Sequence, residues 1–470
     1  MGLSMGTTTV PEGLFRVCRH GRSAAEGYSE EMSRTLIDLA PLRDHPDFRR
    51  LWIGSAVSSL GASIAAMTVS LQIFSLTHSS LAVGGVGLVS LVPVMLGGLC
   101  GGVVADRCDR RTVALAASSC LWIIAGLIAV QAWAELNSVM VLYALIAAQS
   151  FTMPINQAAR GAIYPNILPA EVLPKANALN GAVFTLGMML GPVIGGVMIS
   201  TLGYEWAYTV EVAVFSIGLW ALYRLPPLPP QGDDAASAAR GLRSLREGLG
   251  FVSRSQVLAG SFLVDIAAMI FTFPLALLPA MALIFSADHE TVAGFLSGGA
   301  AFGAFLGMLL SGRFTRVTHQ GRALLRTYLG VAAGAILAGG GAWATAVFAP
   351  GPDTPAAWIG FAVCLVGLML NGASDSIGMI YRSSILQAAV PDRLRGRLQG
   401  VFIVVVSGGP RVGQGLLGAG AQLIGPGAAL AAGGAACAVG TLSIGRALPA
   451  LAAYRAGERA DGAADGDERP

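Results

Sequence analysis

Twelve long apolar runs constrain this 470-residue chain more than any other feature. A run of about twenty apolar residues is long enough to cross roughly 30 Å of hydrocarbon as a helix. Because lipid offers the backbone no hydrogen-bond partner, each run is predicted to be an α-helix. The runs lie near residues 51–76, 81–104, 112–133, 138–160, 178–201, 206–223, 257–284, 292–312, 327–348, 356–380, 398–424 and 427–445. The sequence therefore predicts an all-α membrane protein with twelve transmembrane helices.

The composition supports a lipid environment. Only 12% of the residues are charged, whereas soluble domains carry about 25%, and the mean hydropathy is +0.65. The net charge of +3 gives no reason to expect a nucleic-acid partner. We expect the bilayer itself and a small molecule to be the partners.

Positive charge is distributed unevenly over the connections between the runs. The connections near 77–80, 134–137, 202–205, 285–291, 349–355 and 425–426 contain neither lysine nor arginine. The alternate connections are rich in arginine, which is typical of cytoplasmic loops. This bias predicts that both termini are cytoplasmic in a multi-pass protein of a bacterial inner membrane. An error of two in the number of spans would instead leave some of these arginines outside.

The chain is predicted to consist of two similar halves. Arg160 and Pro169 are nine residues apart, as are Arg382 and Pro391, and the two pairs are offset by 222 residues (382−160). A proline- and arginine-rich stretch separates the halves. We therefore expect two six-helix, pseudo-repeated bundles that face each other across a central site. The expected boundaries are a disordered cytoplasmic N-terminus at 1–40, bundles at 41–223 and 257–448, a cytoplasmic linker at 224–256, and a disordered cytoplasmic tail at 449–470.

The connection between the second and third runs carries a specific motif. It reads Gly102-Val-Val-Ala-Asp106-Arg107-Cys-Asp109-Arg110-Arg111. This resembles the signature loop of the major facilitator superfamily, except that Asp109 replaces a frequent glycine. The resemblance implies the major facilitator fold and a gating role, in which Gly102, Asp106, Arg107, Arg110 and Arg111 latch the two halves together. The alternative is ordinary cytoplasmic charge.

A glycine-rich motif in the fifth run resembles a second pattern of this superfamily. Gly187, Gly191, Pro192, Gly195 and Gly196 match a helix motif associated with its antiporters. The proline permits a kink, and the glycines permit close helix contact. The motif favours export over uptake, although helix packing alone also explains it.

From residue 41 onward the chain is similar to bacterial enterobactin (siderophore) exporters of the drug:proton antiporter group. The similarity lies in the segments 42–49, 71–73, 77–80, 225–230 and 391–398. It implies a secondary active transporter that exports a small amphipathic, siderophore-like molecule by alternating access with proton antiport. A broad multidrug efflux pump, a facilitator importer, and a membrane scaffold or sensor without flux remain alternatives.

Charged residues inside the runs are candidates for coupling and binding. A charge at the centre of a span costs at least about 2.5–3.5 kcal/mol on insertion scales, so each one requires an explanation. Asp265 and Asp375 are the candidates for carrying protons, and each has a structural alternative: Asp375 as a partner of Arg382, Asp265 as a packing hydrogen bond. Arg411 is the substrate-binding candidate, unless it forms a fixed ion pair with either acid. Glu211 is expected near the outer surface, facing lipid.

Uncharged polar residues in the runs are further substrate-binding candidates. They are Gln72, Asn156, Gln157, Asn371 and Gln414. No phosphate-binding loop, zinc-binding HExxH motif or nucleophile elbow is found. We therefore expect a monomeric transporter that is not an enzyme and has neither metal nor cofactor, with protons as the coupling ion.

Overall fold

The computed structural model describes residues 39–226, 250–310, 317–389 and 392–456, with side chains at all of these except 102–103, 105–107, 389 and 392–405. The N-terminal half contains α3 (Pro46–Thr77), α4 (Ser80–Arg107), α5 (Arg110–Trp133), α6 (Val139–Ile167), α7 (Leu173–Leu202) and α8 (Tyr204–Tyr223). The C-terminal half contains α10 (Gln256–Thr272), the short 3-10 helix η1 (Pro274–Ala276), α11 (Leu278–Phe285), α12 (His289–Leu309), α14 (Gln320–Phe348), α15 (Pro355–Ala389), α16 (Asp392–Ile424) and α17 (Pro426–Ala447).

The helices confirm the predicted all-α, twelve-span architecture. In the described part of the chain, eleven segments are long and apolar enough to cross a membrane. The remaining long helix, α16, has 33 residues and would extend about 50 Å at 1.5 Å per residue, which is ample for a crossing. Its glycines, arginines and glutamines make it less apolar than the others. The ranges described contain no β-strand.

The seventh span is not the continuous helix that its apolar run predicts. It consists of α10, η1 and α11 in series. Phe273, which ends α10, has an extended backbone, as expected for a residue that precedes proline. Pro274 begins η1 and Pro279 is the second residue of α11, because proline fits the first turn but breaks a helix interior.

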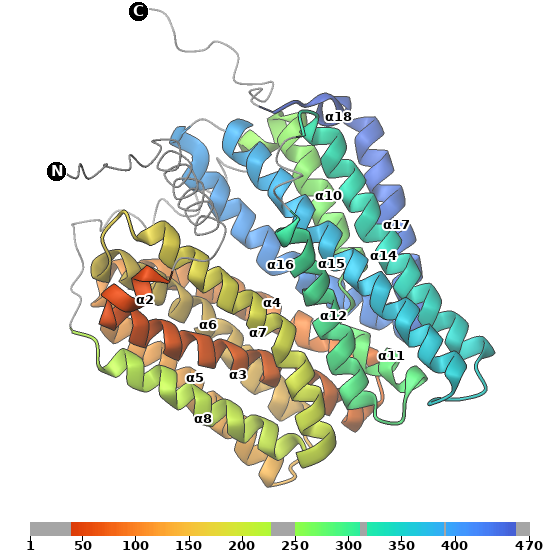
Figure 1. Cartoon of the computed structure of the whole chain (residues 1–470), viewed down its shortest axis with the longest axis horizontal. Helices are drawn as coiled ribbons and strands as arrows, with labels where there is room; N and C mark the ends of the chain where they lie inside the picture. The colour runs from red at the N-terminus through yellow and green to blue at the C-terminus, as the bar shows by residue number, and fades with distance from the viewer. Residues whose placement is uncertain (1–38, 227–249, 311–316, 390–391, 457–470) are drawn as a thin grey trace, which may run out of the picture.

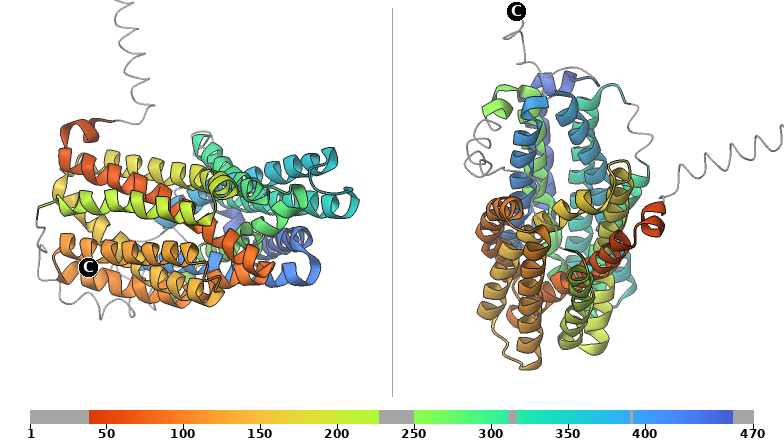
Figure 2. Two further views of the ribbon diagram at one scale, coloured as in Figure 1. Left: turned by 90° about the horizontal axis from the view of Figure 1, so that it is seen from below. Right: turned by 90° about the vertical axis from the view of Figure 1, so that its left-hand side faces the viewer.

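The helix ends define two faces of the molecule. We call the end that holds the α4–α5 connection, the α8–α10 linker and α18 (Pro449–Ala453) the linker end, and the opposite end, with the α3–α4 and α14–α15 connections, the distal end. In Figure 1 the halves lie apart at the ends marked by α2 (Ala40–Asp44) and α18, and converge around α11. In the left view of Figure 2 the helices of the N-terminal half lie mostly on the left and those of the C-terminal half mostly on the right.

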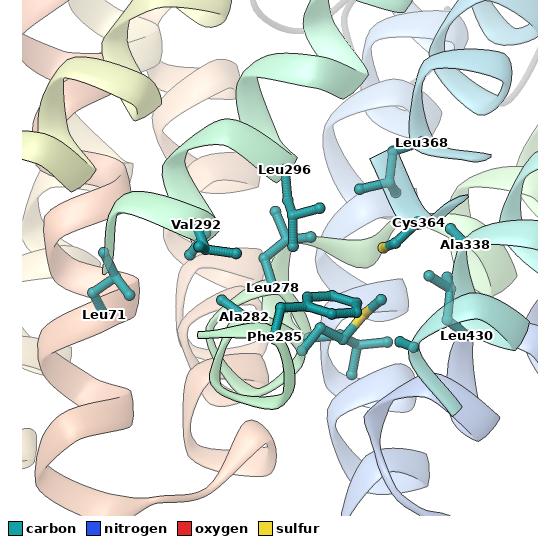
Figure 3. Close-up of a cluster of buried hydrophobic side chains, with 14 of the residues drawn as sticks. Leu71, Leu278, Ala282, Phe285, Val292, Leu296, Ala338, Cys364, Leu368 and Leu430 are labelled. Carbon is teal, nitrogen blue, oxygen red and sulfur yellow. The ribbon is translucent and has the colours of Figure 1, made fainter. Parts of the chain in front are cut away.

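Apolar side chains from both halves close the distal end. Leu71 of α3 and Ile199 of α7 belong to the same buried cluster as Phe285 of α11 and Leu296 of α12. Figure 3 shows Leu71 on one side and the C-terminal side chains on the other. The Ser79 hydroxyl also donates to Gln422 Oε1 across the halves at 3.3 Å. The distal ends are therefore packed together.

The ordered C-terminal half extends beyond the expected limits of 257 and 448. Val252, placed in the expected linker, is 6% exposed. Pro449–Ala453 form the short helix α18, in which Leu451 is fully buried, and Tyr454 is 3% exposed. These residues belong to the apolar core at the linker end of this half.

Candidate functional site

A buried ion pair connects the first and fourth helices of the C-terminal half. Arg382 of α15 and Asp265 of α10 form a salt bridge, and their side chains are 2% and 1% exposed. The Tyr328 hydroxyl of α14 donates to Asp265 Oδ1 at 2.7 Å. The Asp265 carboxylate therefore contacts the charged Arg382 and the neutral Tyr328 at the same time.

Asp375 lies on the same helix as Arg382 and seven residues before it (382−375), which places both on one helix face. It lies near Tyr328, close enough to act on that hydroxyl electrostatically. Its side chain is partly exposed, unlike that of Asp265. Arg382 forms its salt bridge with Asp265, and the alternative role of Asp375 as a structural partner of Arg382 stays a prediction. The Tyr328 hydroxyl therefore hydrogen-bonds one acid and is influenced electrostatically by the other.

The N-terminal half contains a corresponding polar cluster without an acid among the described side chains. Arg160 of α6 donates from Nη1 to Ser55 Oγ of α3 at 2.9 Å and from Nη2 to Ser118 Oγ of α5 at 3.3 Å. Asn156 Nδ2 donates to the same Ser118 oxygen at 2.5 Å. Tyr164, one turn after Arg160, hydrogen-bonds Ser55 and Asn180.

The two clusters occupy matching positions. Ser55 is the tenth residue of α3, counted from Pro46, and Asp265 is the tenth of α10, counted from Gln256. The offset between them is 210 residues (265−55), and Ser118 and Tyr328 have the same offset (328−118). Arg160 and Arg382 are the repeat pair found from the sequence. Each half thus directs an arginine of its fourth helix at its first helix, and a hydroxyl of the third helix belongs to each cluster.

Arg411 and Gln414 lie at the contact between the halves, but Arg411 forms no salt bridge with either acid. Its Nη1 donates to the carbonyl oxygen of Ser407, one turn earlier on α16. The carbonyl oxygen of Arg411 and the Gln414 side chain lie against Gly87 of α4, which has no side chain to separate the helices. The ion pair considered as an alternative for Arg411 is therefore absent from the described residues.

Three of the uncharged candidates are engaged within one half. Asn371 donates to the Val331 carbonyl oxygen of α14 at 3.0 Å, and Asn156 contacts Ser118 as above. Gln72 is 5% exposed, and its Oε1 accepts from Gln131 at 3.1 Å and from Tyr208 at 2.8 Å. Of the five candidates only Gln157, three residues after Pro154, is exposed. The structure therefore does not gather these side chains into one site.

The basic pair of the signature loop holds the N-terminal half together. Arg110 Nη1 donates to the Ala162 carbonyl oxygen of α6 at 3.3 Å, and Arg111 Nη2 to that of Tyr223 of α8 at 2.7 Å. Asp109, the departure from the family pattern, caps α5 by accepting from Thr112 N at 2.8 Å. The side chains at 102, 106 and 107 lie outside the described residues, so the latch stays a prediction.

The glycine motif of α7 contacts both halves. Gly187, Gly191 and Gly195 lie against α3, where a side chain on Gly191 would meet Ser63. Gly196 faces the other way, against the Glu290 backbone of α12. Pro192 is buried between these contacts. The motif therefore packs α7 closely between α3 and the C-terminal half near the distal end.

Glu211 does not face lipid, as the sequence analysis expected. Its side chain is 1% exposed and lies against Gly61 of α3. Its Oε2 has no hydrogen-bond partner among the described residues. The expectation was wrong because α8 turns this face toward α3, and the absence of a side chain at Gly61 leaves room for the carboxyl group.

Sequence reasoning identified Asp265 but missed its surroundings. Tyr328, Ser55 and Ser118 were not singled out, because a lone hydroxyl in an apolar run is usually a packing residue. Arg160 and Arg382 were used only as evidence for a repeat. The signal that could have found both clusters is the offset of 210 that relates Ser118 to Tyr328 as well as Ser55 to Asp265.

Comparisons with known proteins agree with this architecture. The enterobactin exporter EntS of Escherichia coli O6:K15:H31 is 28% identical over 383 residues, which cover 82% of this chain and 87% of that protein. The crystal structure of the nucleoside transporter NupG matches with a TM-score of 0.66 at 16% identity, covering 87% and 99% of the two chains. An inward-facing bacterial homologue of the iron transporter ferroportin matches with a TM-score of 0.64 at 13% identity, covering 87% and 99%.

The family comparison covers both halves and the linker. Residues 37–461 match the model of the transmembrane secretion effector family. That range includes all twelve long helices and both arginine clusters. The chain therefore belongs to the transmembrane secretion effector family and is a multi-pass membrane transporter of the major facilitator superfamily.

Proposed function

We propose that this transporter exports a small amphipathic, siderophore-like molecule by alternating access, driven by proton antiport. The direction and the substrate class are supported by the likeness to an enterobactin exporter over 82% of the chain. The observation that carries the coupling is the buried Asp265–Arg382 pair, with Tyr328 bonded to Asp265 and Asp375 nearby.

The pair provides a physical basis for coupling. Protonation of Asp265 removes the negative charge that compensates Arg382, so the two protonation states favour different arrangements of α10 and α15. The Tyr328 hydroxyl donates to Asp265 and is influenced electrostatically by Asp375, so we propose that it passes a proton from Asp375 to Asp265 by donating its own proton and accepting another. Proton occupancy would thus be linked to the packing of the C-terminal half.

The arginine-rich linker end is proposed to face the cytoplasm. The distal connections contain acidic residues such as Glu135 and Asp353 but no lysine or arginine. The structure, closed at the distal end, would then be the state that takes up substrate from the cytoplasm. Export requires the apolar cluster around Leu71 and Phe285 to separate, while the latch loop near Asp106 draws the linker ends together.

Transport in proteoliposomes with an imposed pH gradient tests the proposal. Enterobactin and ethidium serve as probes, so that a siderophore exporter and a broad multidrug pump give different results. We expect gradient-driven enterobactin flux in the wild type, and its loss in Asp265→Asn and Asp375→Asn. Asp353→Asn removes an acid from a distal loop and is the matched control that retains flux.

Three outcomes would contradict parts of the proposal. Flux that ignores the gradient would remove proton coupling, and normal coupled flux in both variants would remove the two acids from it. Accumulation of the probe inside cells would indicate import. Labelling of Glu135→Cys from the cytoplasmic side would reverse the orientation.

A further inference from the structure

The two arginine clusters differ in a way that identifies a possible ligand site. In the C-terminal half, the first-helix position opposite the arginine holds the carboxylate of Asp265. In the N-terminal half, the same position holds the hydroxyl of Ser55. Arg160 thus has a neutral group where Arg382 has a counterion.

The partners of Arg160 leave its positive charge uncompensated. Among the described side chains its hydrogen bonds go to the two serine hydroxyls, and no carboxylate lies within salt-bridge distance. Its Nε is buried and has no hydrogen-bond partner in the same part of the chain. An uncompensated guanidinium inside a span is costly, so it requires a counterion in at least part of the transport cycle.

The groups around Arg160 supply further hydrogen-bond donors for an anion. Ser118 Oγ already accepts from Arg160 and Asn156, so its own hydrogen is available to donate. Arg160 is partly exposed, and Gln157, three residues earlier, is exposed. A ligand can therefore reach this face of α6, where a guanidinium and an amide would hold its charged group.

We propose that Arg160, with Ser55 and Ser118, forms the subsite that binds the anionic group of the transported molecule. The ligand class is a small organic acid, bearing a carboxylate or a phenolate on an apolar body. The inference rests on the proposed function only in identifying this ligand with the exported substrate. In this proposal the N-terminal half binds the charged group of the substrate, and the Asp265–Arg382 pair of the C-terminal half couples transport to the proton.

A charge-only change at Ser55 tests the subsite. Ser55→Asp places a carboxylate where Asp265 stands in the other half, so it should neutralise Arg160 as Asp265 neutralises Arg382. Ser55→Asn has nearly the same shape without the charge and is the matched control. Arg160→Gln removes the cation itself. The full-length protein in lipid nanodiscs is titrated with salicylate and with salicylamide, its neutral counterpart, and binding is followed by calorimetry.

We expect Ser55→Asp and Arg160→Gln to weaken salicylate binding by about tenfold or more, since a charge-assisted contact is lost. Salicylamide affinity should change less than about twofold, because neutral hydrogen bonds contribute less. Ser55→Asn should weaken salicylate binding much less than Ser55→Asp does, because it changes the hydroxyl without adding a negative charge. If Arg160→Gln does not fold, Ser55→Asp still tests the proposal. Its new carboxylate can pair with Arg160, so the variant should retain its thermal stability.

Two results would overturn the proposal. Equal salicylate affinity in Ser55→Asp and Ser55→Asn would show that the positive charge of Arg160 does not contribute to salicylate binding. Equal weakening of salicylate and salicylamide would indicate a general packing defect. Because the titrations use no gradient, failure of proton coupling leaves them unaffected, and failure of the subsite leaves the flux measurements of the proposed function unaffected.

Discussion

The two halves differ in the groups that surround an arginine inside a membrane span. Each carries an arginine on its fourth helix that contacts the first helix. In the C-terminal half Asp265 neutralises Arg382, and both side chains are almost fully buried. In the N-terminal half Arg160 meets hydroxyls and remains partly exposed. The comparison indicates that, within one repeated architecture, Arg382 forms a fixed ion pair whereas Arg160 is available to a ligand.

The largest expected effect comes from removing one partner of the buried pair. Asp265→Ala leaves Arg382 buried without its counterion, and breaking a buried pair in this way costs about 3–5 kcal/mol. The corresponding change Ser55→Ala removes only a neutral partner from Arg160, and should cost about 1 kcal/mol or less. Thermal unfolding of the purified variants in detergent measures both. Similar losses in the two halves would contradict the distinction between them.

Replacing both members of the pair separates stability from transport. The double variant Asp265→Leu/Arg382→Met removes both charges, and well-packed apolar substitutes for a buried pair are often neutral or stabilising by about 1–4 kcal/mol. We expect its unfolding temperature to stay near that of the wild type, while gradient-driven flux is lost. A double variant that still couples flux to the proton gradient would reduce the pair to a structural element.

A smaller effect is expected at the third-helix position. Tyr328→Phe removes the hydrogen bond to the Asp265 carboxylate, a bond to a charged group worth about 1.5–3 kcal/mol. It should also slow proton transfer, if the hydroxyl joins Asp375 to Asp265. The rate of flux against the size of the pH gradient measures this second effect. Unchanged rates, together with lower stability, would leave Tyr328 a purely structural role.

The smallest effect concerns the distal loops between the third and fourth helices of each half. Asp353 accepts from Ser286 Oγ at 2.6 Å and from Ala287 N at 2.9 Å, and these bonds hold its pKa below the usual 3.8. A lowered pKa means that the carboxylate stabilises the folded loop above the ordinary carboxyl range, and that this contribution is lost as the pH falls through the lowered value.

Hydrogen exchange at the Ala287 amide measures the opening of this loop. Protection should fall as the pH is lowered below about 4 in the wild type. In Asp353→Asn it should be lower from the outset and independent of this titration, once the intrinsic pH dependence of exchange is subtracted. The N-terminal counterpart near Glu135, whose backbone is also left-handed at φ 48°, is the internal reference. Equal pH dependence in the two loops would contradict the role of Asp353.

The Asp265 and Glu211 positions illustrate the limits of sequence reasoning. Both are acids in apolar runs, and the sequence flagged the cost of burying each. It assigned Asp265 to the site and Glu211 to the lipid surface, whereas each is 1% exposed. The difference depends on how a helix is rotated against its neighbours, and runs that are apolar all round carry almost no periodic signal for rotation.

The length and polarity of the apolar runs by themselves determined that this chain has twelve membrane helices in two halves, because hydrocarbon thickness fixes helix length and admits hardly any other backbone structure. The charge bias indicated the orientation, and one loop motif and one helix motif indicated the family. Only the tertiary structure decided that Arg382 pairs with Asp265, that Arg160 has no such counterion among the described residues, and that the distal ends are packed together. These choices depend on contacts between helices far apart in sequence, where Ser55 and Ser118 of one half stand at the positions of Asp265 and Tyr328 in the other.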